Sequence, residues 1–438
     1  MVLVVGAAFA SGPAAAAGFA AAAPPARAVV AAVSSTGPAG GETIPAARSF
    51  QVSVPTQGLS TEAAGPATVS VATDVGAVPA HATFSVAQLP AAVTMDFDLP
   101  HGVIRTGGRQ IGSFPPVAPL TDNLKFPIDV AIRRGGTVVT ERREVTLLLP
   151  TVIIPGYSDE RRPPDRVVLS RLAQYGYTEA GGLPTLFWFS YQSHTMGLEE
   201  GAQALAAYAR RVVLPTTYAA KINVVGYSVG GLFARWNIAY DVDGWSSLVN
   251  RLILVAVPNE GAVLPYLGEH APSFFPFAGL SKTRLARVMM PVFPFWRPTA
   301  AAPWSLPPDA GNSLLAGLNE RPIPPEVRVY LLYGNNDPSH PGGPQTAAGL
   351  TGALPGATVS FGPGDGIVLT ASALGFPING SPAVPALAGR GVMRVDLGRV
   401  YHTHVLQAAA VRAAAALQDR FESAAEVAGT APRAPLGR

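Results

Sequence analysis

Residues 222–235 read INVVGYSVGGLFAR, and this stretch decides how the rest of the chain is interpreted. The apolar run Ile222 to Val225 is typical of a strand that is buried on both faces. The G-x-S-x-G pentapeptide GYSVG follows at 226–230, and a segment predicted to be helical begins at Gly231. A strand, a sharp turn and a helix in this order hold a serine side chain ready for nucleophilic attack.

The glycines around Ser228 have a steric reason to be there. A sharp turn brings the following helix close to the strand, and a side chain two residues before or after the serine would obstruct it. The serine then stands at a helix N-terminus, whose dipole favours a developing negative charge. The alternative interpretation is a glycine-rich turn that starts a helix and carries no chemistry.

Buried apolar runs recur on both sides of this turn, and helical segments separate them. Strands buried on both faces that alternate with helices predict a doubly wound parallel sheet of the α/β class, here over residues 149–427. The expected strands are 151–154, 186–189, 222–225, 252–255 and 327–332, and the clearest helices are 199–213 and 405–427.

The chain before this region has a different pattern. Residues 48–148 contain short runs in which apolar and polar residues alternate, which is typical of strands with one buried face. The runs are 50–54, 68–71, 83–86, 93–97, 128–132 and 138–149, with a hairpin turn at Gly135-Gly136. This spacing predicts a small all-β sandwich of the immunoglobulin-like kind.

The first 47 residues are mostly small and apolar. Residues 1–23 read as the apolar part of a secretory signal peptide or leader, with its first basic residue only at Arg27. A start codon assigned too late would explain the missing positive segment, and a disordered Ala-rich leader is the alternative. Residues 24–47 predict a linker and residues 428–438 a tail. We therefore expect a bacterial protein that is secreted or held on the outer side of the cell envelope.

Composition excludes several classes of protein. Of the 438 residues 48% are hydrophobic and 13% are charged, which excludes a mostly disordered chain. The sequence has no cysteine, so disulfides, thiolate nucleophiles and Cys-based metal sites are excluded. The net charge is only +3 and the arginines are scattered, which disfavours nucleic acid as a partner. No metal or organic cofactor is implied.

The stretch from Val224 to Arg235 resembles the nucleophile turn of the α/β-hydrolase superfamily, and in particular its lipase and esterase branch that includes the lecithin:cholesterol acyltransferase-like enzymes. Later segments agree with that branch in order and spacing: VAVPNEG at 255–261, SLLAGLN at 313–319 and GDGIV at 364–368. The resemblance covers about residues 149–425 and leaves out the β-sandwich. It implies a catalytic Ser-His-Asp triad with Ser228 as the nucleophile.

The resemblance places the general base just before the last helix, where both His402 and His404 stand. In the resembling lipases, apolar residues follow the histidine three and four positions later. His402 meets this pattern with Val405 and Leu406, whereas His404 is followed there by Gln and Ala. We therefore favour His402 and keep His404 as the alternative, which geometry must decide.

Two carboxylates compete for the role of the acid that orients the histidine. Asp365 lies in GDGIV, which matches the D-G-x-V pattern of the resembling lipases. Asp337 follows an apolar run, as the acid commonly does across the broader superfamily, but it also suits a simple turn before Pro338. We favour Asp365 and keep Asp337 as the alternative.

An oxyanion hole needs two backbone N–H groups aimed at the oxygen that becomes negative. The resemblance assigns one to Val229, the residue after the nucleophile, and the other to the loop after the first hydrolase strand. In that loop Pro155 stands where the family commonly has histidine, while Gly156 is kept. Tyr157 is therefore the second candidate donor.

Residues 262–325 form an insertion that is rich in aromatic residues and proline. An insertion of this kind predicts a cap or lid over an acyl pocket, with an ordinary packed subdomain as the alternative.

Together these features predict a secreted serine ester hydrolase, a lipase or carboxylesterase that acts on an ester or lipid substrate through an acyl-enzyme. One alternative is a polyester depolymerase in which residues 48–148 dock onto a lipid or polymer surface. Another is a catalytically inactive binding or adhesion protein that keeps the fold.

Overall fold

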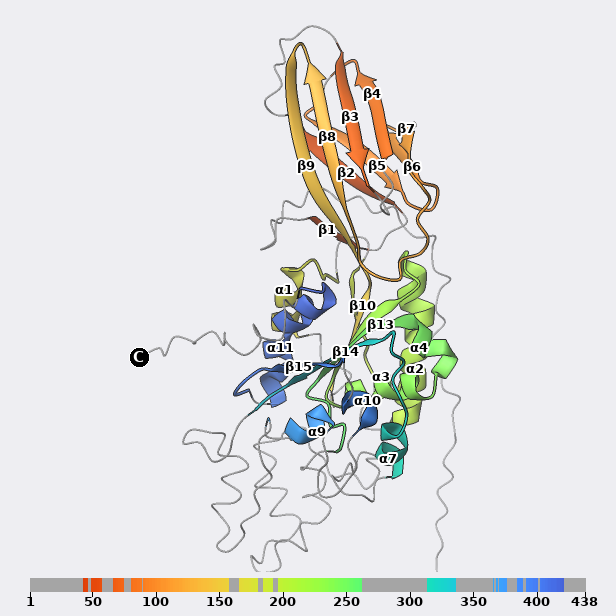
Figure 1. Cartoon of the computed structure of the whole chain (residues 1–438), viewed down its shortest axis with the longest axis vertical. Helices are drawn as coiled ribbons and strands as arrows, with labels where there is room; N and C mark the ends of the chain where they lie inside the picture. Colours follow the sequence, from red (N-terminus) through yellow and green to blue (C-terminus); the bar gives the residue numbers. More distant parts are fainter. Residues whose placement is uncertain are drawn as a thin grey trace, which may run out of the picture.

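The computed structural model describes residues 42–45, 49–56, 66–74, 80–88, 90–156, 165–179, 184–191, 196–261, 313–335, 365, 368, 370–375, 384–388, 391–400 and 402–420. An all-β domain lies at one end of this part of the chain and an α/β domain at the other (Figure 1). Within the described residues, no helix has both the length and the apolar composition needed to cross a membrane.

The all-β domain consists of two sheets whose inner faces share one core. The five-stranded sheet has the order β1 (Glu42–Pro45), β9 (Thr137–Leu148), β8 (Leu124–Arg134), β3 (Ala67–Thr73) and β4 (Ala80–Val86). The four-stranded sheet has the order β2 (Ser49–Pro55), β5 (Ala92–Asp98), β6 (Val103–Thr106) and β7 (Arg109–Ser113). Alternate residues of the strands are buried, and Phe50 stacks on Phe97 with 5.0 Å between ring centroids. These features agree with the predicted β-sandwich.

Glycine turns set the register of two hairpins in this domain. Gly135 and Gly136 have φ of 52° and 88° between the antiparallel strands β8 and β9, as predicted. Gly107 and Gly108, with φ of 55° and 81°, make the same connection between β6 and β7, which the sequence pattern missed because both strands are short and half polar. One expectation needs correction: residues 42–45 were assigned to the linker 24–47 but form β1, which pairs in parallel with β9.

The α/β domain contains a six-stranded sheet in which every neighbouring pair is parallel. Its order is β11 (Leu186–Trp188), β10 (Thr151–Ile154), β12 (Ile222–Tyr227), β13 (Val249–Val255), β14 (Arg328–Tyr333) and β15 (Met393–Asp396). The predicted parallel sheet is confirmed, and β15 is the strand that the sequence did not indicate. With four residues, of which two are charged, β15 is too short and too polar to be recognised as a buried apolar run.

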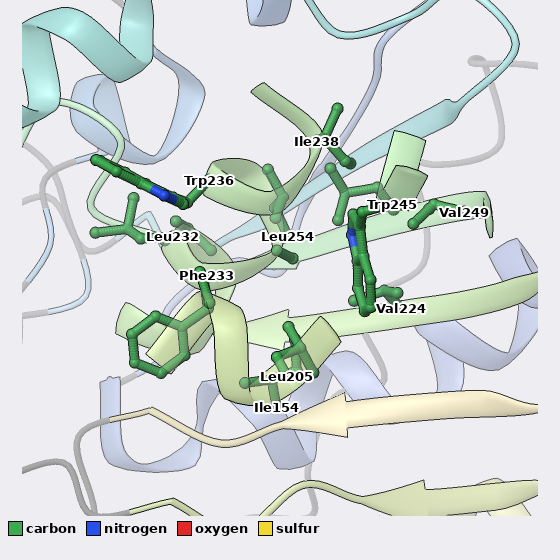
Figure 2. Close-up of a cluster of buried hydrophobic side chains, with 14 of the residues drawn as sticks. Ile154, Leu205, Val224, Leu232, Phe233, Trp236, Ile238, Trp245, Val249 and Leu254 are labelled. Carbon is green, nitrogen blue, oxygen red and sulfur yellow. The ribbon is translucent and has the colours of Figure 1, made fainter. Parts of the chain in front are cut away.

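Helices cover both faces of this sheet, as a doubly wound fold requires. One face packs against α2 (Leu198–Tyr208), α3 (Val229–Ala239), α4 (Trp245–Leu248) and α7 (Ser313–Asn319), and the other against α1 (Arg166–Ala173) and α11 (His402–Leu417). Figure 2 shows Leu205, Phe233 and Trp245 meeting strand residues such as Ile154 and Val224 in the first of these layers. Short helices α9 (Thr370–Leu374) and α10 (Pro385–Ala388) complete the described part.

Both long helices differ in their ends from what the sequence indicated. The helix expected over 199–213 leaves α-helical geometry after Tyr208 and continues as a π-helical turn over Ala209–Val213. The helix expected to begin at residue 405 begins at His402 and ends at Leu417. The second difference matters for the site, because it puts a candidate base on the helix itself.

The two domains meet through an ionic cluster around Arg251 on β13, whose side chain is fully buried. Asp122, from the connection between β7 and β8, lies 2.8 Å from Arg251 and also pairs with Arg328 on β14. Asp419, just after α11, binds both arginines from the α/β side. Burial alone would raise the pKa of Asp122, but the charge of Arg251 and the hydrogen bond from Arg328 outweigh it and lower the pKa. Asp122 is therefore anionic at neutral pH.

Removing Asp122 should destabilise the protein more than removing an exposed carboxylate. We expect Asp122→Ala to lower the free energy of unfolding by about 1–3 kcal/mol, because the buried Arg251 loses a partner. The loss is smaller than for a fully buried ion pair, because the side chain of Asp122 is 45% exposed. Asp129→Ala is the control, because its pair with Arg142 is 3.8 Å long and solvated. Urea unfolding followed by tryptophan fluorescence measures both, and equal losses would contradict the proposed role of the cluster.

Candidate active site

Ser228 occupies a strained turn between β12 and α3. Its backbone has φ of 52° and ψ of −130°, a conformation that a residue with a side chain adopts only when its surroundings enforce it. The side chain is 6% exposed. This is the strand-turn-helix geometry that the pentapeptide predicted.

Two close backbone contacts explain the glycines of the turn. A Cβ atom on Gly226 would lie 2.4 Å from the Cα atom of Gly231, so β12 and α3 can approach only without it. A Cβ atom on Gly230 would lie 2.3 Å from the carbonyl oxygen of Pro155. The second contact brings the loop after β10 against the first turn of α3.

A continuous line of hydrogen bonds starts at Ser228. Its Oγ lies 2.9 Å from Nε2 of His402, and Nδ1 of the same ring lies 2.7 Å from Oδ2 of Asp365. A carboxylate at Nδ1 favours the tautomer that carries its proton there, which leaves Nε2 able to accept a proton from the serine. All three residues are buried: Ser228 is 6% exposed, His402 7% and Asp365 2%.

Asp365 is itself fixed in place. Its second carboxylate oxygen, Oδ1, accepts a hydrogen bond of 2.8 Å from the backbone N–H of Val368. Its backbone carbonyl accepts one of 2.9 Å from the N–H of His402. The acid and the base are therefore held together through the backbone as well as through their side chains.

The alternatives from the sequence have different positions. His404 lies two residues further along α11 and is exposed. Because residues two apart on an α-helix point about 200° apart, only one of the two histidines can face Ser228. The structure brings Ser228, His402 and Asp365 together and leaves His404 outside this line. Asp337 and Tyr157 lie outside the described residues, as do residues 262–312, most of the predicted cap.

Tyr227, next to the nucleophile, binds the element that carries the base. Its hydroxyl donates a hydrogen bond of 2.5 Å to the backbone carbonyl of His402, and the centroids of the two rings are 5.2 Å apart. The side chain thereby connects the end of β12 to the start of α11. No sequence pattern predicts this contact, since position two of the pentapeptide accepts many residues.

The elements expected to supply the oxyanion hole are α3 and the loop after β10. Val229 is the first residue of α3, where a backbone N–H has no partner within the helix and the dipole is positive. Gly156 lies directly against the nucleophile, because a Cβ atom on it would be 2.8 Å from Cβ of Ser228. Both elements named by the sequence are thus next to the serine.

Behind the nucleophile, the fully buried Arg235 of α3 binds two asparagines. Its guanidinium donates to Oδ1 of Asn259 and to Oδ1 of Asn319, each at 2.9 Å, and Nδ2 of Asn319 donates to Glu260. Burial lowers the pKa of Arg235 to about 10, although the nearby Glu260 opposes this, so the group stays charged at neutral pH.

This cluster connects three segments that the resemblance singled out. Arg235 belongs to the nucleophile stretch, Asn259 to VAVPNEG and Asn319 to SLLAGLN. The two asparagines stand on either side of residues 262–312 in the chain. Asn259 precedes the cap predicted at 262–325 and Asn319 lies near its end, so Arg235 ties both segments to α3. The sequence did not identify these residues as partners.

Among the described residues, no cluster of three or more His, Cys, Asp or Glu side chains is arranged to hold a metal ion. The chemistry available to the described site is that of an activated hydroxyl group. A serine that can pass its proton to an imidazole, which a carboxylate orients in turn, is equipped for acyl transfer.

Comparison with known proteins gives only distant matches. No protein-family model matches the chain, and no curated protein matches its sequence. Among solved structures, a protein from Listeria innocua matches with a TM-score of 0.34 and 13% identity, over 63% of this chain and 96% of that one. Phospholipase PlaB from Legionella pneumophila matches with a TM-score of 0.35 and 18% identity, over 52% of this chain and 45% of that one. An esterase from Pyrococcus furiosus matches with a TM-score of 0.27 and 16% identity, over 49% of this chain and 68% of that one.

The contact between Gly156 and Ser228 predicts a steric effect on serine reactivity. Gly156→Ala would place a methyl group 2.8 Å from Cβ of Ser228 and 3.1 Å from the Tyr227 ring, so the loop or the serine must move. We expect the reaction of Ser228 with a fluorophosphonate to slow by about 10- to 100-fold, as displacements near 1 Å do.

Gly197→Ala is the matched control for this prediction. A Cβ atom there meets nothing within 4 Å, and its φ of −72° suits alanine, so the reaction rate should stay at the wild-type value. The rates are measured by intact-protein mass spectrometry. A Gly156→Ala protein that reacts as fast as the Gly197→Ala protein would overturn the assigned contact.

Proposed function

We propose that this protein is an exported serine ester hydrolase of the lipase and carboxylesterase kind. The observation that carries the proposal is the buried line from Ser228 through His402 to Asp365, with 2.9 Å and 2.7 Å separations. Export rests on the apolar segment at residues 1–23. The choice of esters, and of the lecithin:cholesterol acyltransferase-like branch, rests on the motifs whose residues meet at Arg235.

The first half of the proposed reaction forms an acyl-enzyme. Oγ of Ser228 attacks the ester carbonyl while Nε2 of His402 takes the hydroxyl proton, and Asp365 stabilises the imidazolium. The carbonyl electron pair moves to its oxygen, which the N–H groups of Val229 and Tyr157 stabilise. The tetrahedral intermediate then collapses, His402 gives its proton to the leaving alkoxide, and the alcohol departs.

The second half repeats these steps with water. His402 removes a proton from water, the hydroxide attacks the acyl carbonyl, and collapse of the second intermediate breaks the bond to Oγ. The proton returns to Ser228 and the carboxylic acid leaves. An acceptor alcohol in place of water would turn the same cycle into acyl transfer.

Two alternatives fit the described contacts less well. An inactive binding protein has no need for a buried serine, histidine and aspartate in hydrogen-bonded line. A polyester depolymerase with a separable docking module is disfavoured by the ionic cluster at Arg251, which includes Asp122 of the all-β domain. Hydrolysis of soluble or dispersed esters is the function that the contacts support best.

Replacing the nucleophile tests the proposal. Ser228→Ala should reduce kcat for p-nitrophenyl esters by at least about a thousandfold, because the acyl-enzyme can no longer form. Ser170→Ala is the control: Ser170 is an exposed serine on α1 whose hydroxyl donates to the carbonyl of Val167 in the same helix. Rates are measured over acyl chains of increasing length, below and above the solubility limit of each ester. A Ser228→Ala protein with wild-type turnover would refute the proposed function.

A further inference from the structure

Tyr191 contacts the loop after β10, which lies next to Ser228. It follows β11 and is 4% exposed. Its hydroxyl lies 2.8 Å from the carbonyl oxygen of Gly156 and 3.0 Å from that of Pro155, and it donates to both in a three-centre hydrogen bond. One buried hydroxyl therefore holds two consecutive peptide units.

The ring of Tyr191 is itself held on both sides. It stacks on Phe189 with 5.8 Å between centroids and meets Phe233 of α3 edge-on at 4.7 Å. Such contacts restrict the ring to one orientation. The hydroxyl is thus a fixed point that is anchored to the sheet and to the helix that follows the nucleophile.

The loop that Tyr191 holds needs an outside donor. Pro155 has neither a backbone N–H nor a polar side chain, and Gly156 has no side chain, so the two residues cannot anchor themselves. A glycine also leaves its backbone free to rotate. The Tyr191 hydroxyl supplies the constraint that these two residues lack.

Because the peptide group is planar, a hydrogen bond that fixes its carbonyl also fixes the direction of its N–H group. In a planar trans peptide the N–H points opposite to the carbonyl. Fixing the carbonyls of Pro155 and Gly156 therefore fixes the direction of the N–H in each of those two peptide units. Gly156 stands against Ser228, so the peptide unit that joins Pro155 to Gly156 lies next to the serine.

We propose that Tyr191 is a positioning residue for the oxyanion hole: its hydroxyl keeps the peptide units around Gly156 oriented toward the oxygen that becomes negative. This inference rests on the proposed function. It assigns Tyr191 an effect on the transition state and none on ground-state binding, because the ester carbonyl needs these donors most when its oxygen is charged.

The test is Tyr191→Phe, which removes the hydroxyl and keeps the ring contacts. We expect kcat for p-nitrophenyl butyrate to fall about tenfold with KM unchanged, a smaller loss than the roughly 100- to 1000-fold from deleting an oxyanion donor outright. The affinity for a boronic acid, which forms a tetrahedral adduct on serine, should fall by the same factor. The pH profile should keep its shape, since the imidazole is untouched.

Tyr218→Phe is the matched control. Tyr218 is also buried, and its hydroxyl donates at 2.7 Å to the carbonyl of Val117, within the core of the all-β domain. It should lose stability without any change in kcat or in boronic acid affinity. Rates are expressed per site titrated with fluorophosphonate, so unfolded molecules do not enter either value.

Different results would refute the role of Tyr191 and the proposed ester hydrolysis. If the wild-type protein neither hydrolyses esters nor reacts with fluorophosphonate, the proposed function fails. If the wild type is active but Tyr191→Phe matches Tyr218→Phe in kcat, or changes KM alone, or binds the boronic acid as the wild type does, the role of Tyr191 is refuted and the function stands.

Discussion

The close backbone packing around Ser228 is the constraint on which the rest of the site depends. A φ of 52° at a residue with a side chain costs about 1–3 kcal/mol, which the surrounding structure must supply. Buried β12 and α3 supply it, and Gly226 and Gly230 permit their approach. The strain lifts the serine out of the strand, toward His402 on one side and the loop at Gly156 on the other.

Two fully buried arginines connect this centre to the rest of the molecule. Arg235 joins α3 to Asn259, just before the insertion predicted at 262–325, and to Asn319 near the end of that insertion. Arg251 joins the opposite end of the sheet to Asp122 of the all-β domain. A buried charge loses much stability when one partner is removed, so each cluster couples elements that are far apart in the sequence. The ionic cluster makes the all-β domain part of the scaffold that supports the α/β domain.

Local sequence patterns predicted the main elements of the fold. The nucleophile turn, the parallel strands and the β-sandwich follow from periodicity and glycine placement over a few residues. Val405 and Leu406 favoured His402 over His404, but the start of α11 at His402 was missed, because local patterns define helix ends poorly. Tyr191, Asn259 and Asn319 were missed as partners, because each binds a residue far away in the chain and no local pattern identifies that residue.

The most direct test of the account is which histidine activates Ser228. Intact-protein and peptide mass spectrometry would follow fluorophosphonate labelling of the wild type, His402→Gln and His404→Gln. The account predicts one adduct, on the peptide that contains Ser228, with a rate at least about a hundredfold lower in His402→Gln and unchanged in His404→Gln. Wild-type labelling of His402→Gln, or loss of labelling in His404→Gln, would contradict it.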